Sequence, residues 1–343
     1  GIEEAELNTA GLTVVTTIEK PRQDAAVAAV DSLPEDRPEN NRVGLVSMDP
    51  DTGRIVALYG GPDFVEQSRN AVTQDRAQGG STFKPFTLIA ALEDGASLRD
   101  QYESYTPMEI PGYDFPVSNF DSANRGSIDL IRATQDSVNT VYAQLNVEYG
   151  PERTVEVATK LGMPEDTPGL IATASNVLGP ASPRAIDTAT AFGTIASGGV
   201  RHDPFIVDSV TDREGNVRYK GTSDGDRVVD GDVIANATHA MRAVVEGGTG
   251  RTASEIGRPA AGKTGSSNDY RSAWFAGFVP QLVTVVNMYQ VGPDGEEEEL
   301  TGFGGVNIVA GGTWPTRVWT DYMSVALEGV EVEDFPEPDI KTP

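Results

Sequence analysis

The stretch Gly79-Gly80-Ser81-Thr82-Phe83-Lys84-Pro85-Phe86 predicts the start of a helix that carries two reactive side chains. Pro85 cannot donate a helical hydrogen bond and its ring clashes with the carbonyl four residues earlier, so we expect the helix to begin at about Ser81 or Thr82. Ser81 then lies at a helix N-terminus, which favours developing negative charge. Lys84 follows on the same face, about one turn away.

This pair suits nucleophilic chemistry, because a serine hydroxyl needs an adjacent base to react. A lysine can be that base if burial or a neighbouring cation lowers its pKa. The preceding glycines allow the backbone to approach a ligand closely. The pattern therefore predicts Ser81 as a nucleophile and Lys84 as its base.

A second lysine motif, Lys263-Thr264-Gly265, ends a predicted strand far downstream. The chain has six lysines, and Ser-x-x-Lys and Lys-Thr-Gly each occur once, in this order. A cation next to the hydroxyls of Thr264, Ser266 and Ser267 predicts a carboxylate-binding site, and Gly265 permits close ligand approach.

Ser-x-Asn triplets offer a third group of polar side chains. Ser137-Val138-Asn139 interrupts two helical segments, so a turn there can project both Ser137 and Asn139. Ser122-Ala123-Asn124 lies in a loop rich in glycine and asparagine and is a competing choice. We favour the first triplet and keep the second open.

The composition excludes several classes of function. The net charge is −26, from 26 basic and 52 acidic residues, which disfavours binding to nucleic acid or to anionic lipid. The absence of cysteine excludes disulfides, thiolate zinc sites and a cysteine nucleophile. We expect no cofactor and no metal. The two histidines, His202 and His239, are more simply explained as structural residues.

Strand patterns lie towards both ends of the chain and helical patterns lie between them. Strands are expected at 12–18, 43–48, 54–59, 205–210, 216–220, 259–265, 272–279, 282–291 and 300–303. Helices are expected at 21–33, 82–94, 127–136, 140–149, 151–161, 183–198, 231–246 and 314–327.

This order predicts an α+β, three-layer αβα fold, in which helices flank an antiparallel sheet of about five strands and a mainly helical region is inserted. The late strands must pair with the hairpin at 43–59 for one sheet to form. We divide the chain into a strand–helix and linker segment (1–42), a main domain (43–327) and an acidic, proline-rich tail (328–343) that is expected to be disordered.

Beyond these motifs, the chain resembles the transpeptidase domain of class A (bifunctional) penicillin-binding proteins, of the penicillin-binding/serine-transferase superfamily. The similarity extends from about residue 12 to 325 and gives residues 43–327 the β-lactamase/transpeptidase-like fold. It is carried by 12–18, 79–86, 131–145, 192–199, 245–250 and 261–277. Two departures are Ser-Val-Asn in place of the Ser-Asp-Asn of class A β-lactamases, and Ser266 where the family usually has threonine.

The resemblance implies a D,D-transpeptidase that cross-links peptidoglycan stem peptides through a Ser81 acyl-enzyme. Lys84 would take the serine proton, and Ser137 would pass a proton to the leaving amine. Asn139 would bind the substrate backbone, and Lys263 would supply positive potential.

The family also implies the remaining contacts. Thr264, Gly265, Ser266 and Ser267 would bind substrate, and the N–H groups of Ser81 and Ser266 would bind the oxyanion. Donor and acceptor stem peptides would be the substrates, and β-lactams would acylate Ser81.

The resemblance further implies a location at the extracytoplasmic face of a bacterial membrane. The chain begins at Gly1 without methionine, so we expect it to be an excised fragment, and it shows no apolar run that would span a bilayer, so this fragment is expected to be soluble. An upstream glycosyltransferase domain and an N-terminal membrane anchor are expected in the full protein.

Two rival hypotheses remain. A serine β-lactamase would add rapid deacylation by a glutamate-activated water, but a Glu-x-x-Leu-Asn match exists only at Glu4–Asn8, before the serine. A binding module is the other: a β-lactam sensor would resemble a hydrolase subfamily rather than this one, and an inactive relative need not retain Lys84 and Lys263.

Overall fold

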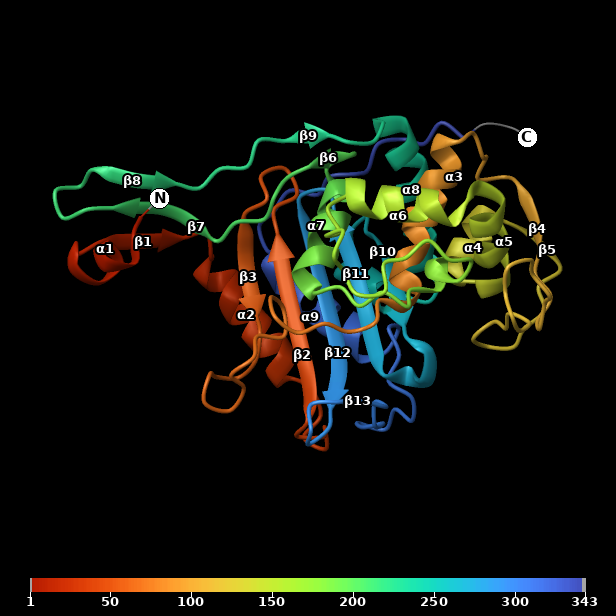
Figure 1. The fold of residues 1–343 in the computed structure, drawn as a ribbon, viewed down its shortest axis with the longest axis horizontal. Helices are drawn as coiled ribbons and strands as arrows, with labels where there is room; N and C mark the ends of the chain where they lie inside the picture. The colour runs from red at the N-terminus through yellow and green to blue at the C-terminus, as the bar shows by residue number, and fades with distance from the viewer. Residues whose placement is uncertain (1, 341–343) are drawn as a thin grey trace.

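A six-stranded antiparallel sheet forms the centre of the protein in this computed structural model, which describes residues 2–340 (Figure 1). The strand order is β10-β11-β12-β2-β3, and β13 pairs with the end of β12. The strands are β2 (Asn41–Met48), β3 (Ile55–Tyr59), β10 (Ala261–Ser266), β11 (Ser272–Val279), β12 (Leu282–Val291) and β13 (Glu297–Glu298). The expected pairing of a late strand with the early hairpin is confirmed, since β12 lies beside β2.

Both faces of this sheet are buried, which explains why its strands read as continuous apolar runs. Side chains along β11 alternate between the faces. Trp274, Ala276 and Phe278 belong to one hydrophobic core, whereas Ala273, Phe275 and Val279 belong to the other. A single strand therefore supplies both cores.

Helices cover the two faces, so the predicted three-layer α+β fold is confirmed (Figure 1). On one side α2 (Lys20–Asp31) and α9 (Trp314–Ala326) pack together against the sheet. On the other side α7 (Ala185–Ala196) packs across β2, β11 and β12. The edge strand β10 packs against α8 (Gly231–Gly247).

The remaining elements are short or belong to the helical region between β3 and β10. These helices are α3 (Lys84–Glu93), α4 (Leu130–Gln135), α5 (Asn139–Tyr149) and α6 (Pro151–Lys160), and α1 (Glu4–Thr9) lies near the N-terminus. Small sheets are formed by β1 (Thr13–Thr16) with β7 (Val207–Thr211) and β8 (Val217–Lys220), by β4 (Gln101–Glu103) with β5 (Ser127–Asp129), and by β6 (Val200–Arg201) with β9 (Asp226–Arg227). Among the described residues, no helix is both long and apolar enough to cross a bilayer.

One predicted helix begins too early, and one predicted strand is absent. The helix expected from residue 127 begins only at Leu130, because residues 127–129 pair with β4. The strand expected at 300–303 does not form, since Leu300 and Phe303 are held by burial in the core. The pairing beside β12 is made instead by β13, whose Glu298 accepts hydrogen bonds from the Asn40 and Gln290 side chains.

The acidic tail forms no helix or strand over residues 328–340, but it packs against the domain, which differs from the expected disorder. Phe335 is 7% exposed, and its ring meets Phe278 edge-on at 5.6 Å between centroids. The Asn236 side chain also donates to the carbonyl of Asp339 at 3.2 Å. One buried aromatic side chain therefore anchors a segment whose composition alone favours disorder.

Replacing Phe335 with alanine is expected to lower the free energy of unfolding by about 3 kcal/mol, because a buried phenylalanine loses its apolar contacts. Denaturant unfolding measures this change. Phe115→Ala is the control, because Phe115 is 80% exposed and should cost less than about 0.5 kcal/mol. Equal small effects of both substitutions would contradict the anchoring of the tail.

Candidate active site

Ser81 lies on a tight turn that packs against the end of β10. Residues Gly80–Phe83 form a 3₁₀ turn, and α3 begins only at Lys84, slightly later than the sequence predicts. Pro85 still occupies the first turn of the α-helix, where its missing N–H costs nothing. Gly80 has a φ of +54°, and a Cβ there would lie 2.3 Å from the carbonyl oxygen of Ser266. Only glycine permits this approach, which brings the turn beside the strand that carries Lys263.

Lys84 is fully buried and its ammonium group reaches the turn between α4 and α5. Its Nζ lies within hydrogen-bond distance of three oxygens: the Ser137 carbonyl at 2.6 Å, Ser137 Oγ at 3.0 Å and Asn139 Oδ1 at 2.7 Å. Ser137 has a φ of +55°, so the turn bends sharply before α5 begins at Asn139. The interhelical turn predicted at this triplet is present.

Lys263 approaches the same hydroxyl from the sheet. It is fully buried on β10, and its Nζ donates to Ser137 Oγ at 2.8 Å and to its neighbour's carbonyl, Thr264 O, at 3.0 Å. Ser137 Oγ is therefore hydrogen-bonded to two lysines that are far apart in the sequence. The structure thus brings Lys84, Ser137, Asn139 and Lys263 into one cluster.

The burial of two cations side by side favours their neutral forms. Burial lowers the pKa of Lys84 well below its usual value, and the charge of Lys263 lowers it further. Burial also lowers the pKa of Lys263, to about 7. A neutral Lys84 amine has a lone pair that can accept a proton, which is the property a general base requires.

Two hydroxyls lie beyond Lys263 along β10. The Thr264 hydroxyl shares a hydrogen bond of 2.7 Å with the hydroxyl of Thr249, and Ser266 Oγ accepts from the N–H of Gly311 at 3.1 Å. Gly265 lies between them, and a Cβ there would come within 2.5 Å of the Gly79 carbonyl oxygen. Gly265 therefore allows β10 to contact the turn that carries Ser81. The sequence predicted only that this glycine allows a ligand to approach closely.

Ser267 stands apart from this row. It is buried, and its hydroxyl accepts from the backbone N–H of Ser272 at 2.8 Å, which closes the turn between β10 and β11. This bond directs the hydroxyl into the turn. The hydrogen bond to Ser272 gives no support to the predicted contact between Ser267 and substrate.

The competing triplet, Ser122 and Asn124, lies in an exposed loop. Asn124 Oδ1 accepts from the backbone N–H of Thr106 at 2.8 Å, and Ser122 has a φ of +54° in a turn closed by its own N–H to the Asn119 carbonyl. Among the described residues, no hydrogen bond joins either side chain to Lys84 or Lys263. The geometry favours Ser137 and Asn139.

Several neighbours of the cluster were not predicted. Asn139 Nδ2 donates to the Ser118 carbonyl at 2.9 Å, which leaves its Oδ1 facing Lys84. The Tyr142 ring centroid lies 5.6 Å from Lys84 Nζ. Tyr142 could have been found from its spacing, because it lies one helical turn after Asn139. Ser118 gives no comparable signal. Thr249 lies within the family-like stretch 245–250, but its contact with Thr264 depends on distant segments coming together.

A histidine-based serine site is not supported. The sequence Gly221-Thr222-Ser223-Asp224-Gly225 has the Gly-x-Ser-x-Gly pattern and lies near His202. However, it connects β8 to β9 rather than a strand to a helix, which the nucleophile elbow requires. The Ser223 hydroxyl accepts from the backbone N–H of Asp203 at 2.7 Å, which explains it as a loop contact.

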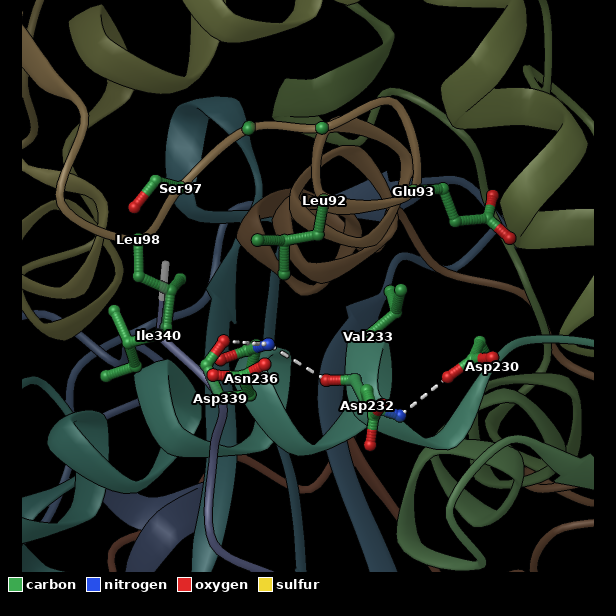
Figure 2. A pocket seen from close by; sticks show the side chains of 12 residues that line it. Leu92, Glu93, Ser97, Leu98, Asp230, Asp232, Val233, Asn236, Asp339 and Ile340 are labelled. Atoms are coloured by element: carbon green, nitrogen blue, oxygen red, sulfur yellow. Dashed lines mark hydrogen bonds between the residues drawn. The ribbon is translucent and has the colours of Figure 1, made fainter. Parts of the chain in front are cut away.

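A cavity of about 360 Å³ lies at the opposite end of α3 from Ser81 and Lys84, beside the start of α8 and the tail (Figure 2). Its lining combines apolar residues such as Leu92 with carboxylates such as Asp230 and Asp232. It contains neither lysine of the cluster. No group of three or more potential metal-ligating side chains occurs among residues 2–340.

Comparison with known proteins places this geometry in a family. The penicillin binding protein transpeptidase domain family matches residues 43–302, which include Ser81 and both lysines. The chain belongs to this family. It is 36% identical to penicillin-binding protein 1A of Mycolicibacterium smegmatis over 98% of this chain and 44% of that protein. It is 33% identical to penicillin-binding protein 1A of Neisseria lactamica over 86% of this chain and 37% of that protein.

Solved structures agree with this assignment. The PonA1 protein from Mycobacterium tuberculosis in complex with penicillin V superposes with a TM-score of 0.86 at 31% identity, over 98% of this chain and 91% of that chain. The predicted resemblance to penicillin-binding proteins is therefore confirmed. The chain spans less than half the length of the curated relatives named above.

Proposed function

We propose that this penicillin-binding protein domain is a D,D-transpeptidase that cross-links peptidoglycan stem peptides through an acyl-enzyme on Ser81. The observation that carries the proposal is the position of Ser137 Oγ, 3.0 Å from Lys84 Nζ and 2.8 Å from Lys263 Nζ. Two buried lysines that share one hydroxyl can relay a proton, and Ser81 lies on the 3₁₀ turn that leads into the helix of Lys84. Such a chain can remove a proton from a nucleophile and return it to a leaving group.

In the acylation step, Ser81 Oγ attacks the carbonyl of the penultimate D-alanine and its proton passes to the neutral amine of Lys84. The proton then moves through Ser137 to the nitrogen of the departing D-alanine as the peptide bond breaks. The N–H groups of Ser81 and Ser266 would stabilise the oxyanion. Support for this pairing comes from Gly80, where a Cβ would lie only 2.9 Å from Ser266 N.

The substrate would be held on both sides of this centre. Asn139 would bind the substrate backbone, while Thr264 and Ser266 would bind its terminal carboxylate beside Lys263 and Gly265. Ser267 would maintain the end of the strand through its bond to Ser272. An amine of a second stem peptide then attacks the acyl-enzyme, which forms the cross-link and frees Ser81.

Acylation by a penicillin tests the nucleophile. Intact-mass spectrometry of the chain with penicillin V should show one adduct that persists for many minutes, and peptide mapping should place it on Ser81. The absence of an adduct would refute the nucleophile assignment and favour a binding module. Rapid loss of the adduct with drug turnover would favour a β-lactamase instead.

Transpeptidation itself is tested by mixing the chain with a stem pentapeptide and an amine-bearing acceptor peptide. The expected products are free D-alanine and a cross-linked peptide in equal amounts. D-alanine release without a cross-linked product would identify a carboxypeptidase.

We also propose that the domain works at the extracytoplasmic face of a bacterial membrane, downstream of a glycosyltransferase domain and a membrane anchor. The greater length of the penicillin-binding protein 1A relatives supports this arrangement. The domain boundaries at 42 and 327 are part of the proposal. Neither the chemistry of the site nor its charge calls for a cofactor or a nucleic-acid partner.

A further inference from the structure

We propose that Thr249 is a positioning residue, which orients the Thr264 hydroxyl toward the carboxylate of the ligand. The inference rests on the proposed function, because it concerns the carboxylate end of the same site. Thr249 lies in the loop that follows α8 and reaches β10 only through tertiary packing.

The hydrogen bond between the two threonines provides the first argument. Their hydroxyl oxygens lie 2.7 Å apart, and Thr264 is 6% exposed. Each hydroxyl has one proton to donate. When Thr249 donates to Thr264, the Thr264 proton is free to bind a carboxylate. Without Thr249, nothing in this pair fixes the direction of that proton.

Ser266 Oγ also accepts a hydrogen bond, and there the donor and the acceptor cannot exchange roles. The Gly311 N–H donates to Ser266 Oγ at 3.1 Å, and an N–H can only donate. The Ser266 proton therefore remains available to a ligand. Thr264 and Ser266 both become donors toward the carboxylate when Thr249 and Gly311 act as their donors.

The backbone of Thr249 is held in place from two directions. Its N–H donates to the Gln135 carbonyl at 3.1 Å, at the end of α4 just before Ser137. A Cβ on Gly312 would lie 2.4 Å from the Thr249 carbonyl oxygen, so the loop after Gly311 packs directly against it. Thr249 thus links the turn that carries Ser137 to the strand that carries Lys263 and Thr264.

Because the protein is strongly acidic, hydroxyl groups oriented as donors help it to bind a carboxylate. A net charge of −26 repels a carboxylate, and the cation next to Thr264 on β10 is Lys263. Burial lowers the pKa of Lys263 to about 7, which weakens its charge relative to that of an exposed lysine. Oriented hydroxyl donors supply an attraction that does not depend on its protonation.

The test compares penicillin V with its methyl ester, which lacks the carboxylate, in the acylation of the wild-type chain and of Thr249→Val. We expect the valine variant to acylate about tenfold more slowly with the acid, which corresponds to one lost hydrogen bond to a charged group. Its rate with the ester should be unchanged. Thr249→Ser, which keeps the hydroxyl, should restore the rate with the acid.

Thr249 is exposed, so the valine variant should fold normally. Thr13→Val is the matched control, because Thr13 is an exposed threonine on β1, outside the central sheet. If Thr249→Val slows acylation equally with the acid and the ester, or slows neither, the inference about Thr249 is overturned. The proposed function still stands in that case, because Ser81 is acylated. A wild-type chain that forms no adduct would overturn the proposed function itself, and this inference with it.

Discussion

Replacing Lys84 with methionine is expected to slow the acylation of Ser81 by about a thousandfold, within the range that a positioned general base contributes. Lys84 is fully buried and its pKa is lowered, and in the proposed mechanism its neutral amine accepts the serine proton. Methionine has a similar length and no basic nitrogen. Stopped-flow measurement of penicillin V acylation would give the rate.

The control for this substitution is Lys220→Met, because Lys220 is an exposed lysine on β8. It should leave the acylation rate unchanged, and thermal unfolding would confirm that both variants are folded. If Lys84→Met is acylated at a rate within tenfold of the wild type, another residue must be the base. Lys263 would then be the first candidate.

The pH dependence gives an independent measure of the same role. Acidification protonates the Lys84 amine, so the acylation rate should fall as the pH drops through the lowered pKa of this lysine. The charge of Lys263 contributes to that lowering. Lys263→Met should therefore raise the pKa of Lys84 and move the acid limb of the profile to higher pH. If the acid limb of the Lys263→Met profile lies at the same pH as in the wild type, the two lysines are not electrostatically coupled.

Replacing Ser137 with alanine is expected to slow acylation by about a hundredfold, because this substitution removes the hydroxyl that connects the two lysines. The proton from Ser81 could still reach Lys84. Its transfer to the leaving nitrogen would lose the relay. The same acylation assay measures the effect, and single-turnover kinetics would show whether the loss lies in the chemical step.

Ser122→Ala is a closely matched control, since Ser122 and Ser137 share the same residue type and nearly the same φ, +54° and +55°. Any backbone strain on replacing the serine should thus be similar in the two variants. Ser122→Ala should acylate at the wild-type rate. If it instead lost activity while Ser137→Ala kept it, the second motif would be Ser122 and Asn124.

The local backbone around the motifs follows from short sequence spacings, although the helix begins at Lys84 rather than at Ser81 or Thr82. Pro85 restricts the start of a helix, and the spacing of three residues puts Lys84 near Ser81 for local reasons. The turn at Ser137 follows from the interruption between two helical patterns. Tyr142 was missed although its spacing from Asn139 was informative, because an aromatic residue in an amphipathic helix is ordinarily part of the core.

Long-range details were less accessible. Burial of Phe335 overrides the acidic composition of the tail, and pairing of 127–129 with β4 overrides helical propensity there. Such contacts depend on segments that are distant in the chain, and no local pattern encodes them.

The sequence by itself determined the two lysine motifs, the local placement of Ser81 with Lys84, and the set of strands and helices from which an α+β fold can be built. Only the tertiary structure decided that Lys263 and Lys84 share the Ser137 hydroxyl, and that Thr249 meets Thr264. The physical reason is that the lowered pKa values of both lysines arise from burial and from their proximity. Both properties exist only after β10, α3 and the α4–α5 turn have packed together.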